Sequence, residues 1–253
     1  MPATQPNDRE HGQKDAEQRL VESALTLFSE NGYDGTSIRA IIERARVTRP
    51  VLYYYFKNKE DLFFRLAHSS FAEFNSFLDE MTARVSGCRE RLKTLLRWVF
   101  EQTERSPEMV RLILHAFFSG SEENLRPRMR AMAEGRFARI VGIMRDGLES
   151  GELGGGDPEV LALVFSGIMD MHSMARAHME EGRLTVELAD ALVDVFMDGA
   201  QCPAPSVKEV KSPFAGTRLD RPVARPGTRL DRPVARPGCD GKTARSKLEI
   251  SEE

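Results

Sequence analysis

LFSENGYDGTSIRAIIERARVTRPVLYYYFKNKEDLF, residues 27–63, carries the signals for two short helices joined by a tight turn. Thr36 or Ser37 is placed to cap the N-terminus of the first helix. Thr48 can cap the second helix, and Pro50 falls in its first turn, where a missing backbone N–H costs nothing. The segment therefore predicts two short, consecutive helices.

The residues before this segment predict one more helix. Between Lys14 and Asn31 the apolar residues recur at three- and four-residue spacing, and Gly32 follows where a helix C-cap would fall. Two short helices, the second capped by a hydroxyl and surrounded by cations, are the arrangement of a helix-turn-helix DNA reader. Residues 14–58 are therefore expected to form a three-helix DNA-binding domain.

The charge distribution supports this interpretation. The 253-residue chain is slightly acidic, with 36 Lys and Arg against 39 Asp and Glu. Between Thr36 and Lys59, however, six cations stand against a single anion, Glu43. A local excess of positive charge in an acidic protein is a candidate footprint for a polyanion such as DNA.

A helix-turn-helix needs an apolar face behind its second helix, polar groups for base edges, and cations or hydroxyls for phosphates. The expected apolar residues are Ile38, Ile41, Ile42, Ala45, Leu52 and Phe56. The residues expected to contact DNA are Thr36, Arg46, Thr48, Arg49, Pro50, Tyr53, Tyr54, Tyr55, Lys57 and Lys59. As an alternative, the tyrosines pack beside Phe56 and the cations form an ordinary solvated face. Helical spacing favours DNA contact for Tyr53 and Tyr54, because it places them away from the core.

The stretch resembles the N-terminal DNA-binding domain of the tetracycline-repressor (TetR) family of bacterial transcription regulators. The resemblance covers Gln18 to Leu66. It rests on LF-x-x-x-G-Y before the capping threonine, then A-x-V-T, L-Y-x-Y-F and K-x-K-E-D-L at the family's spacing. The resemblance implies that Thr36 caps the first of the two short helices and contacts a phosphate, and that Thr48 to Phe56 forms the recognition helix.

Four positions depart from the family pattern. Arg46 stands where glycine is usual, and a left-handed backbone there would cost a non-glycine residue on the order of 1 kcal/mol. Pro50 also replaces a more usual glycine, Ile42 replaces a small alanine, and Tyr55 replaces a frequent histidine. In the recognition helix, Arg49 is expected to read a guanine through its guanidinium fork, and Pro50 to touch a thymine methyl group.

The rest of the chain to residue 200 predicts long helices separated by short segments rich in Gly, Pro or Ser. The expected ranges are 59–85, 89–104, 107–119, 125–150, 158–181 and 186–200. No run alternates with period two, so the fold class is all-α, with a six-helix domain over 59–200 after the three-helix domain. Residues 1–13 and 201–253 are expected to be disordered, and the second segment repeats GTRLDRPVARP (216–226) at 227–237.

In the TetR family the C-terminal helical domain binds a small molecule and dimerises through its last two helices, and the resemblance implies the same here. The apolar residues expected at a four-helix dimer contact are Val160, Val164, Phe165, Ile168, Leu188, Leu192, Val195 and Phe196. The candidate pocket residues, chosen because methionine and aromatic side chains suit an apolar cavity, are Trp98, Met109, His115, Phe118, Met144, Met169 and His172. Packing within one protomer is the alternative for both sets.

Other classes of function find less support in the sequence. No apolar run is long enough to cross a membrane, and the charged N-terminus lacks the apolar region of a secretion signal, so the protein is expected in the bacterial cytoplasm. Three well-separated cysteines argue against a zinc site, and no metal or cofactor is expected. No set of catalytic residues can be recognised, which argues against an enzyme. No repeat of about 30 to 50 residues occurs, which argues against a helical scaffold.

The sequence therefore predicts a homodimeric, ligand-responsive transcription regulator. It would bind a pseudo-palindromic operator in double-stranded DNA and leave it when a small-molecule inducer binds. A repressor is favoured, and an activator stays open as the alternative. The inducer and the operator sequence are not encoded in any motif.

Overall fold

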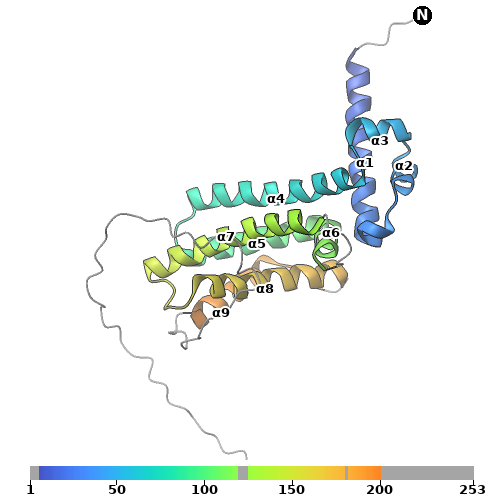
Figure 1. Ribbon diagram of the computed structural model, residues 1–253. Coiled ribbons are helices and arrows are strands. Elements are labelled where there is room, and N and C mark those ends of the chain that lie inside the picture. Colours follow the sequence, from blue (N-terminus) through green and yellow to red (C-terminus); the bar gives the residue numbers. More distant parts are fainter. Residues whose placement is uncertain (1–5, 119–124, 180–181, 201–253) are drawn as a thin grey trace, which may run out of the picture. The chain divides into compact units, whose positions relative to one another are not determined.

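The computed structural model describes residues 6–118, 125–179 and 182–200, and these form α-helices without a strand (Figure 1). The helices are α1 (Pro6–Gly35), α2 (Ile38–Ala45), α3 (Arg49–Tyr55), α4 (Lys59–Arg84), α5 (Cys88–Arg105), α6 (Pro107–Phe118), α7 (Leu125–Ser150), α8 (Pro158–His178) and α9 (Val186–Ala200). The predicted all-α class is confirmed for this part of the chain. None of these helices is long and apolar enough to cross a membrane. The tandem repeat lies outside the described residues.

Most helix ends follow the signals in the sequence. Gly32 has a positive φ of 72° and interrupts the helical backbone of α1, as its predicted capping role requires. α8 begins at Pro158 after Asp157, whose carboxylate accepts a hydrogen bond from the Glu159 N–H at 2.8 Å. α1 begins at Pro6, however, inside the segment for which the sequence predicts disorder. Proline suits a first helical turn, and the apolar periodicity that predicts the helix starts only later.

The N-cap of α2 is Ser37. Its hydroxyl accepts a hydrogen bond from the Ala40 N–H at 3.1 Å, which satisfies one of the donors that a helix start leaves unpaired. The capping role that the family resemblance implies for Thr36 is therefore wrong, because Thr36 lies one residue too early. At α3 the cap position is Thr48, as predicted, although its hydroxyl makes no capping hydrogen bond.

Buried side chains form two clusters. One lies among α4, α5, α7, α8 and α9 and includes Phe100, Met144 and Phe165. The other, which we call the head core, surrounds Phe28 and Phe56 and joins α1, α2 and α3 to parts of α4, α6 and α7. The DNA-binding part therefore shares its core with later helices, and its packing extends past the domain boundary predicted at residue 58.

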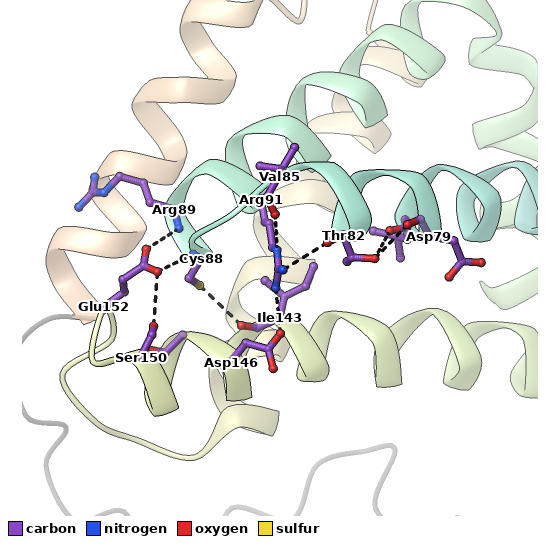
Figure 2. Close-up of polar contacts among 12 residues, drawn as sticks. Asp79, Thr82, Val85, Cys88, Arg89, Arg91, Ile143, Asp146, Ser150 and Glu152 are labelled. Carbon is purple, nitrogen blue, oxygen red and sulfur yellow. Dashed lines mark hydrogen bonds and ion pairs between the residues drawn. The ribbon is translucent and has the colours of Figure 1, made fainter.

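The start of α5 packs tightly against the end of α7 (Figure 2). A Cβ atom on Gly147 would lie 2.6 Å from the Cys88 Sγ, so glycine is what allows the two helices to approach. The Glu152 carboxylate accepts hydrogen bonds from the N–H groups of Cys88 at 2.8 Å and Arg89 at 3.2 Å. It thereby supplies the cap that the N-cap residue, Gly87, has no side chain to give.

Replacing this capping carboxylate should destabilise the fold. We expect Glu152→Gln to lower the free energy of unfolding by about 1 kcal/mol at neutral pH, the usual magnitude of a helix cap. Burial raises the pKa of Glu152, but the hydrogen bonds from the Cys88 and Arg89 N–H groups outweigh it and lower the pKa overall. The contribution of the carboxylate is therefore complete above its ordinary pKa and is lost as the pH falls through the lowered value.

Denaturant unfolding between neutral pH and about pH 3 measures both effects. Wild-type stability should fall more steeply than that of Glu152→Gln as the pH decreases below 4.5, the ordinary pKa of the group. Glu149→Gln, an exposed glutamate near the end of α7, is the control and should keep the wild-type profile. Parallel pH profiles for wild type and Glu152→Gln would show that the cap contributes nothing.

Candidate nucleic-acid interface

Helix α3 has one buried side and one exposed side. Leu52 and Phe56 are fully buried in the head core, as predicted. On the other side, Tyr53 keeps 47% of its surface exposed and Tyr54 keeps 71%. Both tyrosines therefore lie outside the core, as helical spacing predicts. Two neighbouring aromatic side chains left in water are typical of a binding surface.

The first turn of α3 adds polar groups to this surface. Thr48, Arg49 and Pro50 are all exposed. The Arg49 Cζ lies 5.9 Å from the centroid of the Tyr53 ring, within range of a cation–π contact. Such a contact restricts the guanidinium to fewer rotamers while leaving it exposed. Less conformational entropy is then lost when Arg49 binds a base.

Tyr55 differs from the two tyrosines before it. It is half-buried against the head core, and its ring meets that of Tyr54 edge-on with a centroid distance of 4.9 Å. Burial raises the pKa of its phenol, with smaller contributions from Tyr54 and Glu17. The Tyr55 ring therefore supports Tyr54 from behind, and the predicted phosphate contact would fall to its hydroxyl.

Two of the predicted phosphate contacts have internal partners instead. Thr36 is buried, and its hydroxyl lies within hydrogen-bonding distance of the carbonyls of Gly32 at 2.8 Å and Leu27 at 3.0 Å. The Lys59 ammonium donates to the carbonyls of Tyr33 at 2.9 Å and Thr36 at 3.1 Å, and it lies 4.0 Å from the centroid of the Tyr33 ring. The Thr36 hydroxyl thus bonds back onto α1, while Lys59 ties the start of α4 to the end of α1. Both side chains therefore hold this part of the fold together.

The remaining cations around α3 are exposed. Arg46 and Lys57 lie on the surface, and so does Arg44, in the last turn of α2. Arg39 donates a hydrogen bond to Glu43 at 2.7 Å, and this bond raises the pKa of the guanidinium. Arg44 is absent from the residues predicted to contact DNA, and the only sequence signal for it is its share in the local positive charge.

Arg46 adopts the left-handed backbone that its position suggests. With φ 54° and ψ 45° it is the C-cap of α2, and its N–H points to the carbonyls of Glu43 and Ile42. It is the one non-glycine residue with a positive φ in the described chain. The turn of the helix-turn-helix therefore carries backbone strain at Arg46, and the Arg46 guanidinium is exposed there.

A matched pair of substitutions separates the strain from the charge. Arg46→Gly should raise the free energy of unfolding by up to about 1 kcal/mol, because glycine adopts this backbone without strain. Arg46→Ala keeps the strain, and both variants lose the cation. If Arg46 contacts a phosphate, the slope of log affinity for DNA against log salt should fall by about 0.9 per subunit in both. Denaturant unfolding and DNA binding across a salt series measure the two effects, and an unchanged slope would remove Arg46 from the interface.

The predicted pocket residues that the structure describes are spread over both buried clusters. Met144 and Met169 are fully buried in the cluster among α4, α5, α7, α8 and α9, and Trp98 stacks on Phe77 with a centroid distance of 4.5 Å. Met109 packs against the head core. His172 is half-buried, with its Nδ1 2.7 Å from the Ile168 carbonyl oxygen. The side chains of His115 and Phe118 lie outside the described residues.

A shallow hollow lies between α4 and α7. Its lining consists of Leu78, Thr82, Arg139, Gly142, Ile143 and Asp146, none of which is a predicted pocket residue. Its volume of about 180 Å³ is below the roughly 300 Å³ at which sites for drug-sized ligands begin. Asp146 on its rim accepts a hydrogen bond from Arg91 at 2.9 Å (Figure 2). No group of three or more His, Cys, Asp and Glu suited to a metal occurs in the described residues.

The predicted dimer residues divide into exposed, half-buried and buried ones. Val164 on α8 and Val195 on α9 are 52% and 74% exposed. Val160, Ile168, Leu188 and Leu192 are half-buried. Phe165 and Phe196 are buried inside the protomer, where their rings pack together with a centroid distance of 5.6 Å. Their assignment to a dimer surface is therefore wrong, because these two rings fill the protomer's own core.

Ion pairs with α5 fix the rotation of α9. Arg89, Lys93 and Arg97 follow one another at four-residue spacing on α5 and face Asp190, Asp194 and Asp198 on α9. The Arg97 guanidinium makes two hydrogen bonds to the Asp190 carboxylate, at 2.5 and 2.6 Å, and these lower the pKa of Asp190. With one side of α9 held in this way and another in the core, Val195 stays on the surface.

Comparisons with known proteins agree with this description. Residues 20–66 match the family described as bacterial regulatory proteins, tetR family. The fatty acid metabolism regulator protein of Bacillus subtilis is 21% identical over 182 residues, which cover 72% of this chain and 93% of that protein. The transcriptional repressor NicS of Pseudomonas putida is 25% identical over 137 residues, 54% of this chain and 63% of NicS.

A solved structure shares the fold. The structure of AibR in complex with isovaleryl coenzyme A and operator DNA superposes with a TM-score of 0.60 at 25% identity, and the match covers 71% of this chain and 97% of AibR. The match in the first helices and the match in the whole fold therefore point to the same class of protein.

Proposed function

Because the chain belongs to the TetR family of bacterial transcription regulators, we propose that it acts in the cytoplasm as a homodimeric repressor, released from its operator by a small molecule. The exposed side of α3 carries this proposal. There Arg49, Tyr53 and Tyr54 stand on a helix whose other side is locked into the head core by Leu52 and Phe56. A rigid helix with exposed polar and aromatic groups is what major-groove reading requires.

In the proposed complex each subunit inserts α3 into the major groove. Arg49 reads a guanine through the O6 and N7 acceptors, and Pro50 touches a thymine methyl group. Arg44, Arg46 and Lys57 surround α3 and are exposed, so they are available to phosphates. The two copies of α3 would lie about one helical repeat apart, ~34 to 36 Å or slightly more.

The proposed dimer forms through apolar residues of α8 and α9 that the protomer leaves exposed or half-buried. Val160, Val164 and Ile168 follow one face of α8, and Leu188, Leu192 and Val195 follow one face of α9. A two-fold axis beside these faces would bring four helices together and remove the valines from water. The exposure of Val164 and Val195 in the protomer supports this arrangement.

For the effector we propose the acyl-coenzyme A thioesters as the ligand class. Support comes from AibR, which is 25% identical and whose structure holds isovaleryl coenzyme A together with operator DNA. The Bacillus subtilis relative is named as a regulator of fatty acid metabolism. The dimer would have two conformations that differ in the separation of its DNA-binding helices. An acyl-coenzyme A that binds the more widely separated conformation more tightly would lower operator affinity, by an amount set by its difference in affinity for the two conformations.

Selection of random duplex DNA by the purified full-length protein tests the proposal. We expect an enriched inverted repeat with a centre-to-centre spacing near one helical turn. Fluorescence anisotropy with that duplex, titrated with isovaleryl and stearoyl coenzyme A against free coenzyme A, then tests release. Salt-sensitive binding without an enriched sequence would contradict specific recognition, and operator affinity unchanged by either thioester would contradict the proposed ligand class.

A further inference from the structure

The head core is completed by residues far along the chain. Leu112 of α6 is fully buried in it, and Leu125 and Met129 of α7 keep 4% or less of their surface exposed. These residues pack in the same cluster as Phe28 of α1 and Phe56, which ends α3. The orientation of the DNA-binding helices therefore depends on where α6 and α7 lie.

The first turn of α7 makes a polar contact with α4 beside this cluster. The Arg128 Cζ lies 3.5 Å from the centroid of the Phe64 ring, and the guanidinium is 3.6 Å from the Glu60 carboxylate. Phe64 is 3% exposed, so the cation covers the face of a ring that is otherwise out of water. A planar guanidinium suits this double contact better than an ammonium, because it can stack on the ring while pairing with a carboxylate.

From Phe64 the contacts continue to the end of α1. Its ring packs edge-on against Phe63 with a centroid distance of 6.0 Å, and the Phe63 ring meets Phe28 at 5.4 Å and Tyr33 at 5.2 Å. The Lys59 ammonium lies over the other end of this group, 4.0 Å from the Tyr33 centroid. Close-packed aromatic rings of this kind shift together rather than one by one. A change at Arg128 therefore reaches the segment that leads into α2.

We propose that Arg128 is a positioning residue through which α7 sets the orientation of the DNA-binding helices, α1 to α3, relative to the later helices. The inference rests on the proposed function, because orientation matters only to a protein that must place two heads on one operator. Arg128 touches α4 but lies on α7, so it transmits any displacement of α7 to the head. Its contact with Phe64 is the part that an ordinary surface ion pair would lack.

The chain offers a matched control on the same helix. Arg130 is two residues from Arg128 and donates a hydrogen bond to Glu134 within α7 at 2.7 Å. Arg130→Ala therefore removes the same side chain without touching a head contact. Arg128→Lys keeps the charge beside Glu60 and removes the flat stacking group. Arg128→Met keeps an unbranched apolar stem over Phe64, which guards against a change in folding alone.

Head orientation is measured by the distance between two spin labels in one protomer. Arg44→Cys on α2 and Arg145→Cys on α7 are exposed sites for the labels, and Cys202 and Cys239 are replaced by serine. Dilution with unlabelled protein leaves one labelled protomer in each dimer. We expect Arg128→Ala to broaden the distance distribution and Arg130→Ala to leave it unchanged, with Arg128→Lys between them. A distribution in Arg128→Ala identical to wild type would overturn the proposal.

Operator affinity supplies a second measurement. When the DNA-binding helices sample more orientations, a smaller fraction of the protein is in the orientation that binds DNA. Arg128→Ala should therefore bind the selected operator about five-fold more weakly, with its thermal midpoint close to that of wild type. Arg128→Met should show the same loss, and Arg130→Ala none. Failure of wild type to bind any operator would refute the proposed function, while the label distances would still decide the role of Arg128. Unchanged affinity together with broadened distances would show that orientation is not limiting, and would overturn the link to DNA binding.

Discussion

Arg49→Ala should weaken binding to the selected operator by about 30-fold and relax the sequence preference at one position of each half-site. A bidentate arginine–guanine contact discriminates against the wrong base by roughly 1–3 kcal/mol, which is about 5- to 150-fold. Arg49 is exposed at the first position of α3, and its guanidinium lies over the Tyr53 ring. The substitution leaves the buried side of α3 intact, so the loss should fall on recognition and not on folding.

The pattern across related variants gives this prediction its content. Arg39→Ala removes an exposed cation from α2 and should leave the selected motif unchanged. Arg49→Lys keeps the charge but loses the bidentate fork, so it should retain nonspecific affinity and lose the preference for guanine. Tyr53→Phe keeps the ring beneath Arg49 and should cost much less than Tyr53→Ala. Random-duplex selection and anisotropy measure all four, and an unaltered motif with Arg49→Ala would mean that another residue reads the base.

The helices could be predicted from the sequence because their ends are determined by residues close to them in the chain. Gly32 supplies the positive φ that interrupts α1, and Pro158 follows the capping residue Asp157 at the start of α8. Such signals depend on the backbone of a few neighbouring residues, so they can be recognised without knowledge of the tertiary structure. The exposure of Tyr53 and the burial of Leu52 follow in the same way from helical spacing.

The failures concern side chains whose role is set by distant partners. Thr36 and Lys59 lie within the positive segment, but they donate their hydrogen bonds to carbonyls in and just after the second half of α1. No local pattern reveals that choice. The pocket stays a prediction for a related reason. Methionines and aromatics indicate apolar surroundings without saying which ones, and Met109 and Met144 lie in different clusters.

Dependence on distant partners also explains why the dimer surface was only partly predicted from the sequence. Val164 and Phe165 are neighbours on α8, and helical spacing alone shows an apolar face without saying which part of it the protomer fills. The ion pairs between α5 and α9 set the rotation of α9, which leaves Val195 in water while Phe196 packs on Phe165. A one-residue difference thus separates a core ring from a surface valine, and only the packed structure decides it.

The double variant Val164→Asp/Val195→Asp should convert a dimer into a folded monomer and reduce operator affinity by on the order of 100-fold or more. Both valines are exposed in the protomer, so aspartate there stays solvated and the fold is retained. In the dimer the carboxylates would be buried in an apolar contact, with a cost of several kcal/mol each. A monomer places one recognition helix on the DNA and loses the roughly 10²- to 10⁴-fold gain of engaging both half-sites from one molecule.

Val186→Asp is the matched control for this prediction. It makes the same substitution at a residue of α9 that is 53% exposed, close to the 52% of Val164, but lies outside the face formed by Leu188, Leu192 and Val195. Sedimentation velocity should therefore show a dimer for Val186→Asp and a monomer for the double variant, with helical circular dichroism unchanged in both. Because a monomer keeps α3 intact, its residual DNA binding should still select the sequence of a single half-site. A double variant that stays dimeric would move the dimer contact away from α8 and α9, since no close apolar interface accommodates four unpaired carboxylates.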